Sequence, residues 1–109
     1  MRLIEREITS AIRRKDKAFA MSNTTITYNA HTQTYDVLLH GHIIAQINYA
    51  ERLVTLSSCG FRTAVTKNRL NCVLGGLGSC KGVWQKNHQW FIGNSFHTEE
   101  FTDGIKVKF

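Results

Sequence analysis

The sequence predicts an α+β domain in which two helices pack on an antiparallel sheet of about six to seven strands. Apolar residues recur with helical spacing near the N-terminus and again within residues 66–77, and they alternate with a period of two elsewhere. The connections between the alternating segments are short, which favours antiparallel neighbours over parallel strands. A chain of 109 residues, of which 42% are hydrophobic, is long enough to bury one core as a single domain.

The first element is expected to be an amphipathic helix over residues 2–18. Basic residues crowd its C-terminal end, where cations complement the helix dipole. We therefore divide the chain into residues 1–20, a basic amphipathic helix, and residues 21–109, a single α+β domain. The helix is expected to cover its own sheet or that of a second copy, which would make a homo-oligomer. Its apolar stripe is formed by Leu3, Ile4, Ile8, Ala11 and Ile12.

The alternating segments that follow are expected to form a meander of strands. A second helix is inserted over about residues 66–77, with Thr66 as its expected N-cap and a run of glycines at its end. A hairpin about residues 86–88 and a last strand over residues 104–109 complete the order. The four strands expected before the inserted helix are residues 24–29, 33–40, 42–48 and 53–57.

The residue types that catalysis and metal binding require are present, but their spacing is unsuitable. The three cysteines follow a Cys-x12-Cys-x7-Cys pattern without the close pairs from which structural zinc sites are built. Cys72 falls beside a helical apolar face and is expected to pack as a small hydrophobe. The acidic cluster of Glu99, Glu100 and Asp103 is expected in a solvated loop before the last strand. We therefore expect no enzyme, no metal and no cofactor, with free thiols in a reducing compartment.

The net charge of +6 suggests an acidic partner. The first 17 residues hold six Lys and Arg against three acids, so half of the excess lies in this segment. A basic balance favours polyanions through counterion release, although solubility alone explains a surplus of this size. No apolar run approaches the ~18 residues that cross a membrane, so we expect a cytoplasmic protein without a membrane partner.

Basic and aromatic side chains together mark the candidate binding surface. Aromatic rings on a sheet beside cations hold single-stranded nucleic acid by stacking and phosphate contact. Trp84 and Trp90 could instead form a cross-strand pair in the core. Lys67 and Arg69 are expected in the first turn of the inserted helix, where they either face an anion or are solvated. The candidate residues are Arg13, Arg14, Lys15, Phe61, Arg62, Lys67, Arg69, Trp84 and Lys86.

The segments at residues 39–45, 60–71 and 85–91, with the Asp-Gly pair at residues 103–104, resemble a family of small bacteriophage proteins that includes members from phages of cyanobacteria. The most specific is the Thr-Lys-x-Arg-Leu-Asn segment at residues 66–71, preceded by the Gly-aromatic pair at residues 60–61. The Leu-His-Gly-x-x-Ile-Ala segment at residues 39–45, residues 85–91 and the terminal Asp-Gly pair complete the resemblance. It covers nearly the whole chain and implies expression inside an infected bacterium. It implies no activity, cofactor or catalytic residue.

Two functions from different classes follow. The first is a non-enzymatic protein that contacts nucleic acid through its basic and aromatic surface, with binding that weakens steeply as salt rises. The second is a host-takeover or anti-defence factor that binds and inhibits a host protein. Either function places the protein in the host cytoplasm.

Overall fold

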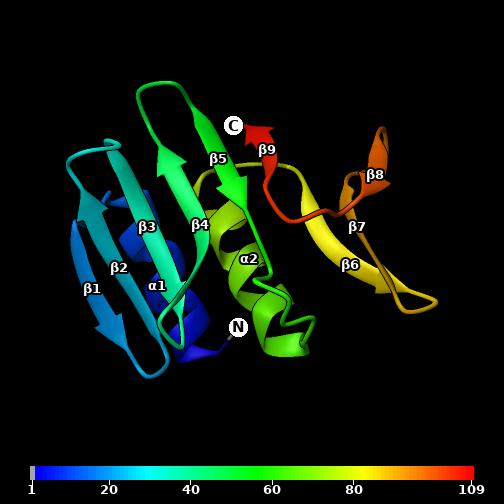
Figure 1. Ribbon diagram of the computed structural model, residues 1–109, viewed down its shortest axis with the longest axis horizontal. Coiled ribbons are helices and arrows are strands. Elements are labelled where there is room, and N and C mark those ends of the chain that lie inside the picture. Colours follow the sequence, from blue (N-terminus) through cyan, green and yellow to red (C-terminus); the bar gives the residue numbers. More distant parts are fainter. Residues whose placement is uncertain (1) are drawn as a thin grey trace.

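A computed structural model describes residues 2–109 (Figure 1). Residues 2–109 form two helices and nine strands, which confirms the predicted α+β class. The strands divide between two antiparallel sheets, one of six strands in the order β1-β2-β3-β4-β5-β9 and one of three in the order β6-β7-β8. The elements are α1 (Leu3–Arg13), β1 (Ala18–Met21), β2 (Thr24–Asn29), β3 (Thr34–Leu39), β4 (His42–Asn48), β5 (Leu53–Leu56), α2 (Ala64–Gly76), β6 (Gly82–Lys86), β7 (Gln89–Gly93), β8 (Thr98–Glu100) and β9 (Ile105–Lys108).

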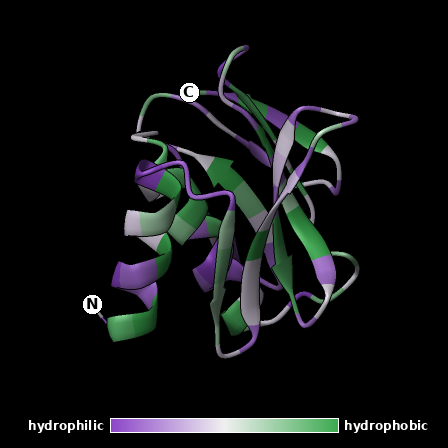
Figure 2. Ribbon diagram, turned by 90° about the vertical axis from the view of Figure 1, so that its left-hand side faces the viewer, coloured by the Kyte–Doolittle hydropathy of each residue, from purple (hydrophilic) through white to green (hydrophobic). Residues whose placement is uncertain are grey.

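Both helices lie on one face of the six-stranded sheet, and the core fills the space between them (Figures 1 and 2). Of the stripe predicted for the first helix, Ile8, Ala11 and Ile12 are almost fully shielded from solvent, Ile4 is partly buried and Leu3 stays 54% exposed. The two helices approach closely at Gly76, where a Cβ would lie 2.9 Å from Cβ of Ile12 and from the Thr9 carbonyl oxygen. The apolar stripe of α1 is therefore covered within its own chain except at its N-terminal end.

The first helix is shorter than predicted, and the strand that follows it was missed. Helix α1 ends at Arg13 instead of residue 18, and β1 then pairs with β2 at the edge of the sheet. Arg14 caps the helix and Lys15 has a φ of 59°, a left-handed conformation that ends α-helical propagation. The apolar stripe stops at Ile12, so no buried side chain remains to anchor a further turn.

The inserted helix begins two residues before the predicted start. Thr63 is the N-cap, and its Oγ1 accepts a hydrogen bond from the backbone N–H of Thr66 at 3.2 Å. The prediction that Thr66 caps the helix was wrong because two threonines three residues apart satisfy the same pattern. Lys67 and Arg69 consequently lie beyond the first turn, and the dipole argument for an anion beside them does not hold.

Strands β6, β7 and β8 form a separate three-stranded sheet, shown at the right of Figure 1, while β9 returns to the six-stranded sheet. The hairpin predicted about residues 86–88 is confirmed, with Asn87 and His88 both at positive φ, as a tight two-residue turn requires. The prediction of a loop around Glu99 and Glu100 was wrong, because these residues form β8 and pair with β7. The sequence of β8, Thr-Glu-Glu, lacks the alternation of apolar and polar residues by which strands are recognised.

Candidate nucleic-acid interface

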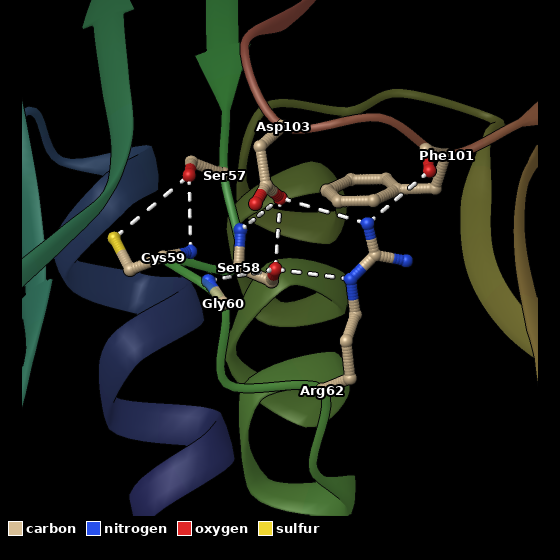
Figure 3. A network of polar contacts seen from close by, with 7 residues as sticks. All are labelled: Ser57, Ser58, Cys59, Gly60, Arg62, Phe101 and Asp103. Atoms are coloured by element: carbon tan, nitrogen blue, oxygen red, sulfur yellow. Dashed lines mark hydrogen bonds and ion pairs between the residues drawn. The ribbon is translucent and has the colours of Figure 1, made fainter.

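Residues 57–63, the corner between β5 and α2, form a network of polar contacts (Figure 3). The carboxylate of Asp103 accepts hydrogen bonds from the backbone N–H and the Oγ–H of Ser58, both at 2.8 Å. Arg62 donates from Nε to Ser58 Oγ at 3.1 Å and places its guanidinium 3.8 Å from the same carboxylate. The corner thereby joins the end of β5 to the segment that leads into β9.

The acid–base behaviour of Asp103 follows from these contacts. Partial burial acts to raise its pKa, but the hydrogen bonds from Ser58 and the charge of Arg62 outweigh it, so the pKa lies below the usual 3.8. A carboxylate with a depressed folded pKa stabilises the protein above its unfolded pKa, and this contribution is lost as the pH falls through the folded value. The corner is therefore expected to weaken in acid.

Asp103→Ala is expected to lower the free energy of unfolding by about 1–2 kcal/mol at pH 7, because it removes charge-assisted hydrogen bonds to a partly exposed carboxylate. Urea unfolding at pH 7 and at pH 3 measures the effect. The gap between wild type and variant should narrow at pH 3, where the wild-type carboxylate begins to protonate. A gap of equal size at both pH values would contradict the role assigned to the ionised carboxylate.

Arg62 and Lys67 lie over the aromatic rings that join the small sheet to the rest of the molecule. The guanidinium of Arg62 is 4.9 Å from the ring centre of Trp90 and 5.2 Å from that of Phe101. The ammonium of Lys67 donates to Oε1 of Gln85 at 3.0 Å and lies 5.7 Å from the Trp90 ring. Trp90 is only 2% exposed, so it belongs to the core. Both cations are therefore engaged in contacts within the chain.

Arg69 is a correction to the predicted surface, since it is buried and only 7% exposed. Its Nε donates to Thr24 Oγ1 at 3.0 Å, and another guanidinium nitrogen donates to Asn23 Oδ1 at 3.3 Å. A third bond joins it to Oδ1 of its neighbour Asn68. The guanidinium thus ties α2 to the start of β2, and it is not available to a phosphate.

Trp84 and Lys86 lie on the outer face of the small sheet. Trp84 is 37% exposed and stacks on Phe91, its cross-strand partner, with ring centres 6.1 Å apart. Glu100 pairs with Phe91 on the next strand and brings a negative charge beside the rings. This face offers an aromatic surface, but the carboxylate beside it works against a polyanion.

The strongest concentration of cations and rings lies elsewhere, where four aromatic side chains form a row across one end of the six-stranded sheet. Tyr28 and Tyr35 have ring centres 5.0 Å apart, Tyr35 and Tyr49 4.8 Å, and Tyr49 and Phe109 6.1 Å, all in edge-on contact. The rings come from β2, β3, the β4–β5 turn and the residue after β9. These positions meet because, in an antiparallel sheet, the C-terminal end of one strand lies beside the N-terminal end of its neighbour.

Three cations lie over this row. The ammonium of Lys17 is 4.6 Å from the ring centre of Tyr28, that of Lys15 is 5.1 Å from Tyr49, and the guanidinium of Arg52 is 5.2 Å from Phe109. All three side chains are exposed, so their free hydrogen-bond donors face water. The four rings with Lys15, Lys17 and Arg52 are called the aromatic–cation row below.

The row is fixed to the end of α1. The hydroxyl of Tyr49 donates to the carbonyl oxygen of Ile12 at 2.6 Å, and the same carbonyl in the last turn of the helix also accepts from the backbone N–H of Lys15 at 3.1 Å. Burial, with smaller contributions from the charges of Tyr35 and Asp16, raises the pKa of Tyr49 to about 12, so the hydroxyl stays protonated and keeps donating. This contact places exposed Arg13 and Arg14 beside the row, although Arg14 also pairs with Asp16 at 2.9 Å.

The structure separates the residues that the sequence grouped together. Arg13, Arg14 and Lys15 lie at the row, while Trp84 and Lys86 lie on the small sheet on the other side of the molecule (Figure 1). Phe61 is half exposed beside the start of α2. The row itself was missed by sequence reasoning, although its signal was present. Each of its four aromatic residues lies at or just beyond one end of a predicted strand, and in an antiparallel sheet these strand ends lie together at one end of the sheet.

The surroundings of two cysteines and of the possible metal ligands can be described directly. Burial raises the pKa of Cys72, which opposes the thiolate form that a nucleophile needs. Cys59 donates its S–H to the carbonyl of Ile43 at 2.9 Å. Within residues 2–109, no three His, Cys, Asp or Glu side chains come together as a metal site. In the same range, no helix is long and apolar enough to cross a bilayer.

Comparison with known protein families identifies this chain's family. The sequence matches the family described as "Kyanoviridae Gp96 protein" over residues 1–108. The chain belongs to this family. It is therefore a cyanophage protein, in agreement with the resemblance of its segments to phage proteins, and the family description names no activity. No curated protein and no solved structure matches this Kyanoviridae Gp96 family member.

Proposed function

We propose that this phage protein binds nucleic acid without catalysis, by holding the phosphodiester backbone at the aromatic–cation row and the adjoining Arg13 and Arg14. The observation that carries the proposal is the row itself, in which three of the four rings each hold a cation at one end of the sheet. A cation placed over a ring keeps its outward donors available while losing conformational freedom before a ligand arrives. A phosphate that binds such a cation therefore pays less conformational entropy for fixing the side chain.

The geometry of the rings favours backbone contact over base stacking. Neighbouring rings meet edge-on, and Lys15 and Lys17 lie over the faces of Tyr49 and Tyr28. A base that stacked on Tyr28 or Tyr49 from the side of the cation would have to displace that cation. Binding through phosphates alone is largely independent of sequence and strongly dependent on salt. We propose that the protein acts in this way in the host cytoplasm.

The binding test compares two double variants that remove the same charge. Lys15→Ala with Lys17→Ala acts on the row, while Lys81→Ala with Lys86→Ala acts near the small sheet. Fluorescence anisotropy of labelled single- and double-stranded 20-mers is measured from 20 to 200 mM salt. The row variant is expected to bind at least roughly tenfold more weakly than the wild type at low salt. The slope of the logarithm of its binding constant against the logarithm of the salt concentration should be smaller in magnitude by about 1.8 on duplex DNA, or by about 1.4 on single strands.

The control variant is expected to retain most of the wild-type affinity and slope. Circular dichroism checks that both variants fold. Absence of binding by the wild type at 20 mM salt would refute the proposal, as would an equal loss in both variants. The second result would mean that only the net charge matters.

A further inference from the structure

The chain that leaves α1 is held in a fixed turn beside the aromatic–cation row. The backbone N–H of Lys15 donates to the carbonyl of Ile12 at 3.1 Å. The next N–H, that of Asp16, donates to the carbonyl of Ala11 at 3.0 Å. These two bonds, with Lys15 at a φ of 59°, form a Schellman motif, a common way for a helix to end. The backbone therefore fixes where Lys15 and Asp16 stand.

Both side chains at this turn are unfavourable for ending a helix. Glycine is preferred at the left-handed position of Lys15, because a Cβ is strained there. The negative end of the helix dipole disfavours the carboxylate of Asp16, and an apolar side chain that packs on the last turn is more usual at that position. In the proposed function Lys15 supplies a cation over Tyr49. The stability of the helix, in contrast, gives no reason for a carboxylate at residue 16.

The carboxylate of Asp16 engages one of the cations that adjoin the row. Its Oδ2 accepts from a terminal guanidinium nitrogen of Arg14 at 2.9 Å, and the side chains of Arg14 and Asp16 are 56% and 31% exposed. Its charge also reaches Tyr49, whose pKa it helps to raise. In the sequence Asp16 is the single acidic residue of the segment 8–35 and stands among four cations, at residues 13, 14, 15 and 17. An ion pair this exposed contributes little to stability, so a phosphate can replace the carboxylate.

We propose that Asp16 is a built-in competitor of the nucleic acid at the aromatic–cation row: it holds Arg14 in the free protein, and a phosphate takes its place when the nucleic acid binds. This inference rests on the proposed function and adds to it a group that limits the affinity. Because Asp16 stands in for a counterion of Arg14, fewer ions are released when a phosphate binds there. The affinity and its salt dependence are therefore both lower than the cations alone would give.

The test extends the anisotropy titrations to Asp16→Asn in the full chain. This change removes the charge but keeps the backbone N–H that ends the helix, and circular dichroism checks that the variant folds. It is expected to bind the labelled 20-mers about threefold to tenfold more tightly than the wild type at 20 mM salt. Its salt slope should be larger in magnitude by about 0.9 on duplex DNA, or by about 0.7 on single strands.

Glu99→Gln is the matched control, because it removes an exposed carboxylate from β8 of the small sheet, far from the row in Figure 1. It should change the affinity by less than about twofold, since salt screens a distant charge. A gain as large as that of Asp16→Asn would overturn the proposal, because the net charge alone would then explain both results.

A double-mutant cycle with Arg14→Ala shows whether the effect passes through the ion pair. In the Arg14→Ala background, Asp16→Asn should gain no more affinity than the control, because no guanidinium remains to be released. An equal gain with and without Arg14 would overturn the proposal. If the wild type binds and the row variant loses affinity, but Asp16→Asn gains none, the inference falls and the proposed function stands. If neither the wild type nor Asp16→Asn binds at 20 mM salt, both fall together.

Discussion

Gly93→Ala is expected to lower the free energy of unfolding by about 3 kcal/mol or more. Gly93 ends β7 with a φ of 149°, a conformation that side chains rarely adopt. A Cβ at this position would lie 2.0 Å from the carbonyl oxygen of His97 and 2.8 Å from Cα of Thr98. Both are backbone atoms, one in the connection between β7 and β8 and the other in the first residue of β8, so no side-chain rotation can relieve the contact. The small sheet would have to open between β7 and β8.

Gly104→Ala provides the matched control for this change. Gly104 also has a positive φ, 92°, but among the described residues nothing lies within 4 Å of the added Cβ. Its replacement should cost only the backbone strain, about 1 kcal/mol. Urea unfolding gives the loss of stability in each variant, and the difference between the two losses measures the cost of the steric contact between the added Cβ and the backbone at Gly93. Equal losses of stability would show that β7 and β8 do not pack as tightly at Gly93 as the structure indicates.

Arg69→Ala is expected to destabilise the protein by about 3 kcal/mol, because it leaves the acceptors of a buried donor without their partner and opens a cavity. The acceptors affected are Thr24 Oγ1 and the side-chain oxygens of Asn23 and Asn68. Arg13→Ala removes the same charge from an exposed site and should change stability by no more than about 0.5 kcal/mol. Thermal or urea unfolding compares the two variants.

In the nucleic-acid assay we expect the opposite order of effects, with Arg13→Ala changing the salt dependence of binding and Arg69→Ala leaving it unchanged. If enough Arg69→Ala folds at 10 °C for titration, its salt slope should match that of the wild type, whereas Arg13→Ala should lose about 0.9 on duplex DNA. A reduced slope for Arg69→Ala would mean that this guanidinium reaches a phosphate. Such a result would contradict its assignment as a link between α2 and β2.

The fold class could be predicted from sequence because the apolar periods of helices and strands are visible within a short stretch of consecutive residues. The stripe ending at Ile12 and the alternation of β2 to β5 are signals of this kind. The failures concern elements whose state is decided by distant partners. Strand β1 is four residues long and exists by pairing with β2, and β8 is polar because all of its side chains face solvent. The apolar segment of β1 is too short, and that of β8 too polar, to be recognised by a period of its own.

The binding surface was harder to predict because residue type does not reveal exposure. Arg69 and Arg13 look alike in a sequence, yet one is buried between α2 and β2 and the other is solvated. The aromatic–cation row required knowledge of which strand ends lie together, since Tyr28 and Phe109 come from opposite ends of the chain. Only the cations at the end of α1 could be placed from sequence, because their clustering is local.

The pairing of β5 with β9 has a consequence for biosynthesis in the infected cell. The strands from β1 to β5 form one after another by hairpin steps, but β5 gains its second neighbour only from Ile105–Lys108. Until the ribosome has released that segment, the edge of β5 offers unpaired amides and carbonyls to any other nascent chain. Completion of the main sheet is thus postponed until after translation of the intervening half of the protein, and its long loop closure is expected to set the pace of folding.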